Sequence, residues 1–346
     1  MDISNKAEDQ VAMANRKYVH WQDEGVEKIP PNEAEDIQAV ADQINAMQKA
    51  QYNSHRHCYT GKAMLTGLAG THARTQGIVK GTLIVKDDLP KHLKQSMFDH
   101  GGEHAVDRIP QPRGFAMKVF NVPGEKFDST KTAQDIEFNS TPALDLADAK
   151  TTKEIIDLRI NYGGNKPELY KKLEARPDTD LQKFRDSVRN THLESTRQYS
   201  QTAYRFGDYV AKYCLVPSSE TQKKLYEETV KPDEHEPDIL SQWLKNFHEE
   251  HDAEYLLQFQ LCENLEDQPV EYAGKVWDPE KYPWQTVATL VIPKQDSFNY
   301  ELKSFWEDHM RIDPWLGLKS LQPLGSPNRL RRVGGLKPDF LKWSEC

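Results

Sequence analysis

The chain has 346 residues, of which 37% are hydrophobic and 29% charged, so it is long enough to bury a sizeable core. Its formal net charge is −9 with acidic and basic residues interleaved, and this excludes a nucleic-acid partner because phosphate binding needs a basic face. No apolar run approaches the length of a membrane span, and the polar, acidic N-terminus resembles neither a secretory signal nor a transit peptide. These features predict a cytoplasmic globular protein.

The first predicted element is a helix. Asn32 can cap its start, and apolar residues recur at helical spacing from Ile37 to Met47, which predicts a helix to about residue 51. Three strands are predicted after it, where β-branched or alternating runs are bounded by glycine and proline. They lie at 75–85, 114–122 and 136–141.

A charged middle segment, 152–192, predicts helices. One more helix is predicted at about 236–250, with Ile239, Trp243, Leu244 and Phe247 on one face. Strands return at 202–217, 253–264 and 286–293. Strand clusters separated by a helical insert predict an α+β fold, with an antiparallel sheet or barrel and helices packed outside it.

Two histidine motifs and the cysteines point to no metal site. His55, His57 and Cys58 in HRHC have no second ligand pair at a zinc-like distance. His248 and His251 in HEEH are three residues apart, whereas a zincin needs a spacing of four, so we interpret them as a solvated helix face. The four cysteines lie far apart, which predicts reduced thiols that mostly fill the core. They are Cys58, Cys214, Cys262 and Cys346.

The stretch GTHARTQG (70–77) places His72 among small residues, just before a β-rich segment. A single histidine in such a place is equally explained by a structural role. Two later segments, PRGFAMKVF (112–120) and FNSTPALD (138–145), follow it at informative spacings. Together the three segments resemble the catalase-like haem superfamily, including its short fungal and bacterial relatives and coral-type allene oxide synthases.

The resemblance continues in later blocks and covers about residues 20–332. The matching blocks are YRFGDYVAKYCLVP (204–217), PWQTVATLVIPKQDSF (283–298) and PWLGLKSLQPLGSPNRLRR (314–332). It implies one catalase-like domain over residues 1–346, with an antiparallel β-barrel core, a polar lead at 1–20 and an atypical tail at 334–346. It also implies haem b as cofactor and a peroxide or an oxygenated lipid or metabolite as substrate. Catalase relatives often form oligomers, so a homo-oligomer is a further expectation.

The resemblance assigns roles to individual residues. His72 would move a proton between the two oxygens of a bound peroxide, and the Asn139 amide would donate a hydrogen bond to one of them. Residue 71 is Thr, as in the allene oxide synthase branch, whereas catalases usually have Val there. Thr71 therefore favours an organic hydroperoxide over hydrogen peroxide. Arg113, in the Arg-Gly-Phe-Ala block, is a candidate cofactor-binding residue.

The proximal side departs from the family pattern. The family's axial ligand is the tyrosine of an Arg-x-x-x-Tyr motif on a helix, and here Arg331 occupies the arginine position but Gly335 the tyrosine position. Residue 69, where relatives often have a propionate-binding arginine, is Ala69. Arg205 and Tyr209 have the Arg-x-x-x-Tyr spacing but lie in a predicted strand. The abrupt end of the resemblance after Val333 suggests a shifted exon boundary, which sequencing of the transcript's 3′ end would test.

Three functional hypotheses follow. The chain is a haem-dependent oxidoreductase or hydroperoxide-rearranging enzyme, a haem-free member of the same fold that isomerises or binds a small molecule, or a catalytically inactive homologue.

Overall fold

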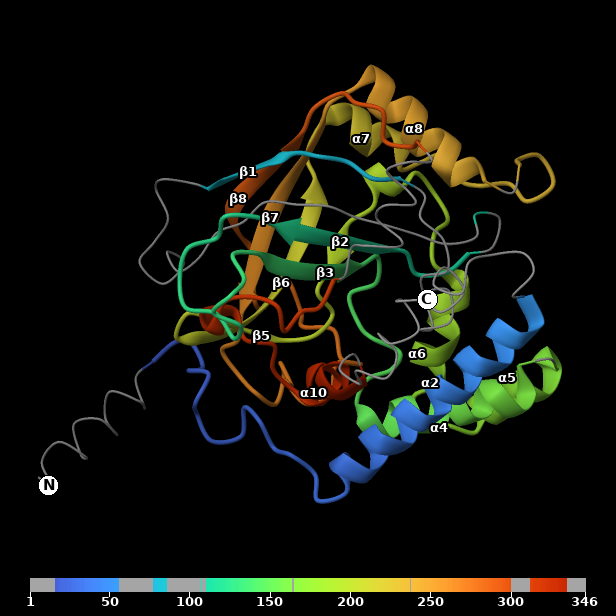
Figure 1. Cartoon of the computed structure of the whole chain (residues 1–346), viewed down its shortest axis with the longest axis vertical. Helices are drawn as coiled ribbons and strands as arrows, with labels where there is room; N and C mark the ends of the chain where they lie inside the picture. The colour runs from blue at the N-terminus through green and yellow to red at the C-terminus, as the bar shows by residue number, and fades with distance from the viewer. Residues whose placement is uncertain are drawn as a thin grey trace, which may run out of the picture.

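An eight-stranded antiparallel sheet forms the centre of the described chain (Figure 1). The computed structural model describes residues 16–55, 77–85, 107, 110–163, 165–236, 238–299 and 312–334. Seven strands follow the order β1-β8-β7-β6-β4-β3-β2, and β5 pairs with β6 beside this path. The strands are β1 (Thr82–Val85), β2 (Gly114–Val119), β3 (Gln134–Asn139), β4 (Gln198–Tyr199), β5 (Tyr204–Phe206), β6 (Tyr209–Pro217), β7 (Ala253–Leu261) and β8 (Gln285–Ile292).

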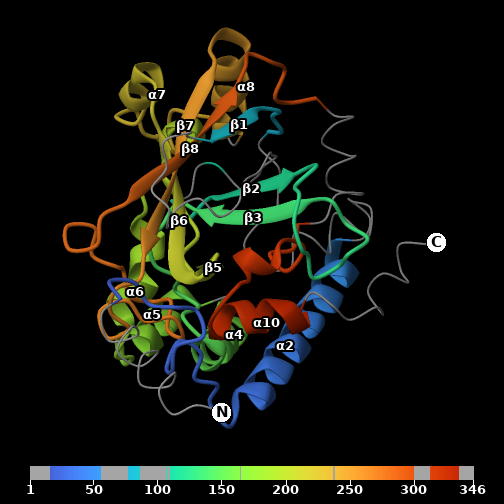
Figure 2. The ribbon, with the colours of Figure 1, turned by 90° about the vertical axis from the view of Figure 1, so that its left-hand side faces the viewer.

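The sheet is strongly curled. In two perpendicular views β2 and β3 run across the direction of β6, β7 and β8 (Figures 1 and 2), so the strands wrap into a half-barrel. The side chains that point into this half-barrel form the main core, with Met117, Phe138, Leu215, Leu257 and Leu290 among its buried members. Burial of each such side chain stabilises the fold by about 1.5–3 kcal/mol.

Helices lie at both ends of the sheet (Figures 1 and 2). At one end are α7 (Glu220–Leu225) and α8 (Ile239–Glu250), and at the other are α2 (Glu33–His55), α4 (Ala149–Tyr162), α5 (Lys166–Glu174), α6 (Thr179–Phe184) and α10 (Ser326–Gly334). Short 3₁₀ turns occupy Arg185–Ser187, Leu193–Ser195 and Lys319–Leu321. The predicted α+β class is confirmed. Of the helices that the structure describes, none is both long and apolar enough to cross a membrane.

Two predicted elements were wrong in part. The strand predicted over 202–217 is a hairpin, because Gly207 adopts φ +63° and lets the chain reverse between Phe206 and Tyr209, which pair with each other. The helical segment predicted up to residue 192 stops at Phe184 and continues only as a 3₁₀ turn. Of the strand predicted over 75–85, only Thr82–Val85 is strand among the described residues, and the other predicted strands and helices are confirmed to within a few residues.

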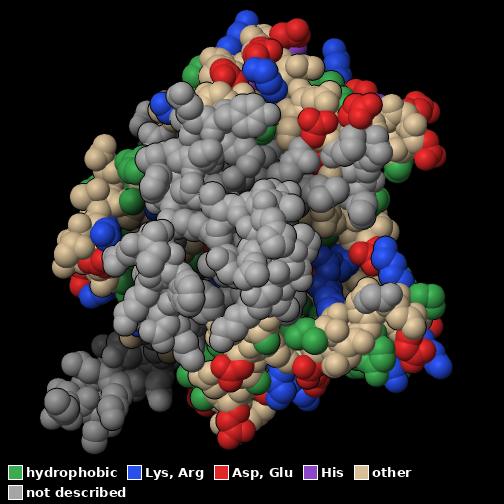
Figure 3. All heavy atoms as spheres, turned by 45° about the vertical axis from the view of Figure 1, so that its right-hand side comes forward, with side chains coloured by type: hydrophobic (Ala, Val, Ile, Leu, Met, Phe, Trp, Pro, Cys, Tyr) green, Lys and Arg blue, Asp and Glu red, His purple; other side chains and the backbone are tan. Residues whose placement is uncertain are grey.

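Charged side chains of both signs are mixed over the coloured part of the face that Figure 3 shows. Many of them pair locally, as Lys245 does with Glu249 at 2.5 Å and with Asp296 at 3.1 Å. This mixture agrees with the interleaved charges of the sequence.

Candidate functional site

The predicted distal residue Asn139 is the last residue of β3. It pairs with Gly114 of β2 on one side and with Tyr199 of β4 on the other. Because successive side chains of a strand point to opposite faces, Ile136 and Phe138 enter the core while Glu137 and Asn139 share the other face. The strand ladder thus fixes where the Asn139 amide lies.

The side chain of Asn139 has an unsatisfied polar atom. Its Oδ1 is buried and accepts no hydrogen bond from the described residues. A buried amide oxygen without a partner costs about 1–3 kcal/mol. Asn139 Oδ1 is one of twelve such buried side-chain atoms in the described part of the chain, and a ligand on this face would satisfy it. His72 and Thr71, the other predicted distal residues, lie outside the described residues.

Arg113 lies next to Asn139, directly before β2, and is 5% exposed. Its backbone N–H donates to Ser140 Oγ at 2.9 Å, and the Ser140 N–H donates back to the Arg113 carbonyl at 2.9 Å. Its Nη2 donates to Asn190 Oδ1 at 3.3 Å. The structure therefore brings Arg113 and Asn139 to the same end of the β2–β3 pair.

The contacts of Arg113 extend to the start of α8. Asn190 Nδ2 donates to the Asp107 carbonyl at 2.5 Å, and Asp107 Oδ2 accepts from the Leu240 N–H at 2.8 Å. A carboxylate at this place satisfies one of the free N–H groups of the first helical turn and complements the helix dipole. Arg113 is thus held by a polar network that also positions α8.

The predicted proximal residue Arg331 reaches the same face of β3. From α10 its Nη1 lies 3.6 Å from Glu137 Oε2 and donates to Asn328 Oδ1 at 3.3 Å. Burial would lower the pKa of Arg331, but attraction by Glu137 and the nearby Tyr204 and Tyr213 phenols outweighs burial and raises it. Burial raises the pKa of Glu137, against the attraction of Arg331. Glu137 and Asn139 are two residues apart on β3, so their side chains lie on the same face of the strand. Arg331 therefore contacts the face that carries Asn139.

The predicted haem centre lacks an axial ligand at the expected position. Residue 335, four residues after Arg331, is a glycine, so it has no side chain to bind iron. Gly335 lies outside the described residues. Tyr204 and Tyr213, whose phenols raise the pKa of Arg331, belong to the main core, and burial raises the pKa of both phenols. The cavity they line measures only about 10 Å³, which leaves no room for a haem beside either ring.

Arg205 and Tyr209, which share the Arg-x-x-x-Tyr spacing, flank the hairpin turn between β5 and β6. The Arg205 guanidinium stacks on the Trp21 ring at 4.2 Å, so it serves the packing of the N-terminal segment. The described residues include no group of three or more His, Cys, Asp or Glu that could hold a metal ion.

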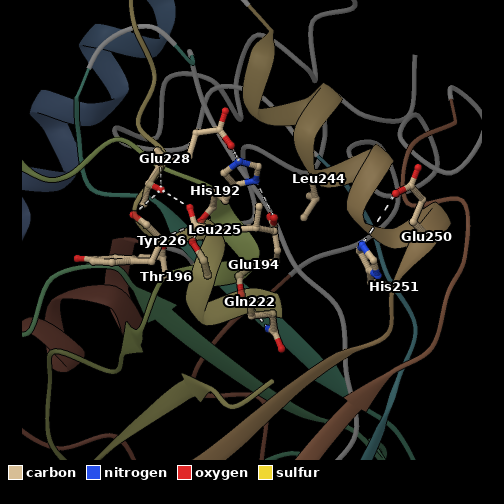
Figure 4. Close-up of polar contacts among 12 residues, drawn as sticks. His192, Glu194, Thr196, Gln222, Leu225, Tyr226, Glu228, Leu244, Glu250 and His251 are labelled. Carbon is tan, nitrogen blue, oxygen red and sulfur yellow. Dashed lines mark hydrogen bonds and ion pairs between the residues drawn. The ribbon is translucent and has the colours of Figure 1, made fainter. Parts of the chain in front are cut away.

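His192, which no sequence motif marks, contacts two carboxylates (Figure 4). His192 Nδ1 lies 2.9 Å from Glu194 Oε1 and its Nε2 lies 3.0 Å from Glu228 Oε2, and its ring stacks on Trp243 at 4.0 Å. Burial lowers the pKa of His192, but the hydrogen bonds to the two glutamates outweigh it and raise the pKa. Because both ring nitrogens are engaged, this group ties the segment before β4 to α8 and is not a free acid or base.

His248, predicted to lie on a solvated helix face, is 2% exposed, so that prediction was wrong. It packs beside Phe247 at the C-terminal end of α8, and its buried Nδ1 has no hydrogen-bond partner. Burial lowers the pKa of His248 to about 4. His251, the other histidine of the motif, is exposed. The apolar face of α8 extends further toward the C-terminus than its helical spacing indicated.

A cavity of about 210 Å³ lies next to β6, on the strand face opposite the main core. Lys212 lines this cavity. No motif marks this lysine, and the only signal for it in the sequence is a charged residue in the middle of an apolar strand. Cys214, the next residue on that face, and Cys262 are buried free thiols, as predicted for these two cysteines. Burial raises the pKa of Cys262 to about 12, so it stays protonated.

No protein-family model and no curated protein sequence matches the chain. Solved structures do match, and three of them are catalases. A fungal catalase matches with a TM-score of 0.56 at 17% identity, over 79% of this chain and 58% of that catalase. A bacterial catalase matches with a TM-score of 0.55 at 15% identity, over 79% of this chain and 56% of its own. Catalase A from Saccharomyces cerevisiae matches with a TM-score of 0.52 at 14% identity, over 79% and 60%.

The chain thus covers less than two thirds of each of these catalases. At these identities, the structural matches establish a shared fold and leave the function open. The antiparallel half-barrel with its surrounding helices agrees with that likeness, and the chain has the catalase-like fold.

Proposed function

We propose that this chain is an oxidoreductase that acts on an organic hydroperoxide, with haem b as its cofactor and with His72 and Asn139 on the distal side. The observation that carries the proposal is the buried, unpartnered Oδ1 of Asn139 on the β3 face that Arg331 also contacts. The catalase-like fold supports it, because Arg113 and Asn139, two of the residues assigned by sequence resemblance, lie at the same end of the β2–β3 pair.

The residues fit haem on the distal side. An amide whose oxygen has no partner among the described residues is free to orient by its ligand contacts, and Arg113 supplies a guanidinium group that suits the cofactor's carboxylates. The residues do not fit on the axial side, because Gly335 offers no ligand and Tyr204 and Tyr213 are buried in the main core. We therefore assign no chemical step to the iron.

Each distal residue has a defined task. The neutral imidazole of His72 takes the proton from one peroxide oxygen and returns it to the other. The Asn139 amide N–H donates to a peroxide oxygen and holds the substrate in one orientation. The Thr71 hydroxyl hydrogen-bonds the imidazole or the distal oxygen, which favours a substrate with an organic group. Haem b, when bound, supplies the redox chemistry that cleaves the O–O bond.

A second candidate function is favoured by the ion pair between Arg331 and Glu137. In the family pattern this arginine stabilises the axial phenolate, whereas here a carboxylate already neutralises it. A haem-free protein that binds or isomerises an oxygenated small molecule on the Asn139 face is consistent with this pairing.

An absorption spectrum separates the two candidates. The full chain is expressed with 5-aminolevulinate and passed through gel filtration, and the Soret band is compared between the wild type and Asn139→Leu. A Soret band in both, with cumene hydroperoxide turnover lost only in Asn139→Leu, supports the haem proposal. A folded, colourless wild type that binds no added haemin rejects it and leaves the haem-free candidate.

A further inference from the structure

The 210 Å³ cavity beside β6 lies on the same sheet face as Asn139, whose β4 partner Tyr199 lines it. Its other walls come from β6, β7, the residues just before β4 and the segment between β7 and β8, and they include Arg197, Lys212, Gln260, Trp277 and Trp284. Val276 also lines it and is 46% exposed, so the cavity reaches the surface. A volume of this size accommodates a small organic molecule rather than a single water.

Lys212 is buried in this cavity without a counter-charge. The residue is 3% exposed, and the one hydrogen bond from its Nζ among the described residues goes to the Lys275 carbonyl at a long 3.4 Å. Its Nζ also lies over the Trp277 ring at 4.9 Å. No Asp or Glu is among the cavity-lining residues.

The consequence of this burial is a neutral, nucleophilic amine. Burial lowers the pKa of Lys212 to about 7, and the neighbouring Cys262 thiol opposes this only slightly because it stays protonated. At neutral pH about half of such amines are unprotonated, against less than about 0.1% for an ordinary lysine. Desolvation of this kind is how enzymes activate lysine toward carbonyl compounds.

Arg197 adds a second cation to the same cavity. Its guanidinium lies over the rings of Tyr199 and Trp284, 5.3 Å from each centroid. Its Nη2 donates to Gln258 Oε1 at 3.1 Å and contacts Cys214 Sγ at 3.3 Å, while its buried Nε has no partner. A guanidinium with an unused donor and no carboxylate partner among the cavity-lining residues is suited to an anionic ligand.

We propose that this cavity binds a small carbonyl compound that carries a carboxylate, such as an aldehyde acid or a 2-oxo acid, and that Lys212 forms an imine with it. Arg197 binds the carboxylate, and the carbonyl carbon lies against Lys212 Nζ. The indole rings of Trp277 and Trp284 cover the ligand's apolar part.

The reaction is balanced without a further reagent. The lone pair of Lys212 Nζ attacks the carbonyl carbon, forming a C–N bond and a carbinolamine. Loss of the carbinolamine oxygen as water breaks the C–O bond and leaves the imine. Nothing is oxidised or reduced, and the two protons that leave nitrogen depart with the water.

The cavity walls are held by a second residue of the sheet. Gln260, the β7 partner of Lys212, donates from Nε2 to the carbonyls of Trp277 at 3.1 Å and Tyr282 at 2.7 Å. These bonds fix the 277–282 segment over the strand. The site is therefore formed before the ligand arrives.

The test traps the imine on the full chain. Wild-type protein is treated with glyoxylate and sodium cyanoborohydride at neutral pH, and modification of each lysine is followed by peptide mass spectrometry. Lys275, exposed on the adjacent segment, is the internal reference. We expect Lys212 to be modified more than about tenfold faster than Lys275, because far more of its amine is unprotonated. Equal rates at the two lysines would overturn the proposal.

Two variants test the parts separately. Arg197→Gln is expected to slow glyoxylate modification of Lys212 and to leave modification by acetaldehyde, which has no carboxylate, unchanged. If Arg197→Gln leaves the glyoxylate rate unchanged, the assigned carboxylate site is wrong. Lys212→Met should remove the fast modification, whereas Lys275→Met should keep it. Since the wild-type comparison needs no variant, misfolding of any of them does not protect the proposal.

Discussion

Arg331 Nη1 and Glu137 Oε2 form an ion pair, 3.6 Å apart, on the face of β3 that also carries Asn139. The pair joins α10 to the sheet at the place where the catalase pattern has an arginine and an axial tyrosine. Its partner is a carboxylate from the sheet, so the pair fixes α10 against β3 through opposite charges.

Removing one partner of this pair should destabilise the protein more than removing both. Arg331→Met leaves the Glu137 carboxylate without its counter-charge, whereas Arg331→Met combined with Glu137→Gln leaves no charge behind. We expect a coupling free energy of about 0.5–3 kcal/mol between the two positions, measured from urea unfolding of the two single variants and the double variant. Additive effects would show that the two side chains do not interact.

Asn139→Leu should reduce hydroperoxide turnover without loss of stability. Loss of the positioned amide is expected to lower kcat on the order of 100-fold. The substitution also removes a buried oxygen without a hydrogen-bond partner, so the melting temperature should stay the same or rise. Asn161→Leu on the exposed side of α4 is the control and should leave turnover unchanged. A marked fall in the melting temperature of Asn139→Leu would indicate a structural role.

His192 predicts a stability that declines in mildly alkaline solution. Its folded-state pKa is raised above 6.5 because the hydrogen bonds to Glu194 and Glu228 outweigh burial. The stabilisation is therefore fully present below about pH 6.5 and is lost as the pH rises through the raised pKa. Between about pH 6 and pH 9 the free energy of unfolding should fall further for the wild type than for His192→Gln.

The matched control is His251→Gln. His251 is exposed at the end of α8, and its Nε2 lies 3.9 Å from Glu250 Oε2. This variant should keep the wild-type pH dependence. Parallel curves for the wild type and His192→Gln would contradict a charged His192 in the native state.

Lys212 predicts the opposite dependence on pH. Its folded-state pKa, about 7, is lower than the 10.5 of an exposed lysine, so the buried ammonium costs stability below pH 7 and the cost is relieved as the pH rises toward 10.5. Lys212→Met should raise the free energy of unfolding at pH 6 by about 1–3 kcal/mol and flatten the alkaline rise. Denaturant titrations at a series of pH values measure both, and a destabilised Lys212→Met would show that the ammonium is compensated in the native state.

Much of the fold could be predicted because the local patterns were strong. The alternating run that became β3 and the helical spacing that became α2 both match their elements, and the Arg-Gly-Phe-Ala and Asn-Ser-Thr-Pro blocks lie on neighbouring strands. The hairpin at Gly207 was missed because the apolar alternation continues across the turn, and only the glycine backbone conformation separates β5 from β6.

The polar contacts of the site could not be predicted from spacing. Arg331 pairs with Glu137 because α10 packs against β3, and His192 pairs with Glu228 because an isolated bridge joins Thr191 to Thr229. The Lys212 side chain is buried because the 277–282 segment covers the face of β6 opposite the main core. The alternating pattern of the strand does not predict this cover. Contacts between residues far apart in the sequence determine which charged groups are desolvated, and local sequence patterns do not predict these contacts.

Titration of haemin into the purified full chain tests whether the Asn139 face binds haem. We expect a saturable Soret band at about one haem per chain for the wild type, and tighter binding for Gly335→Tyr because that variant supplies the tyrosine of the family pattern. Gly335→Phe, which adds the ring without the oxygen, should behave like the wild type. A folded wild type without a saturable Soret band would show that this face does not bind haem.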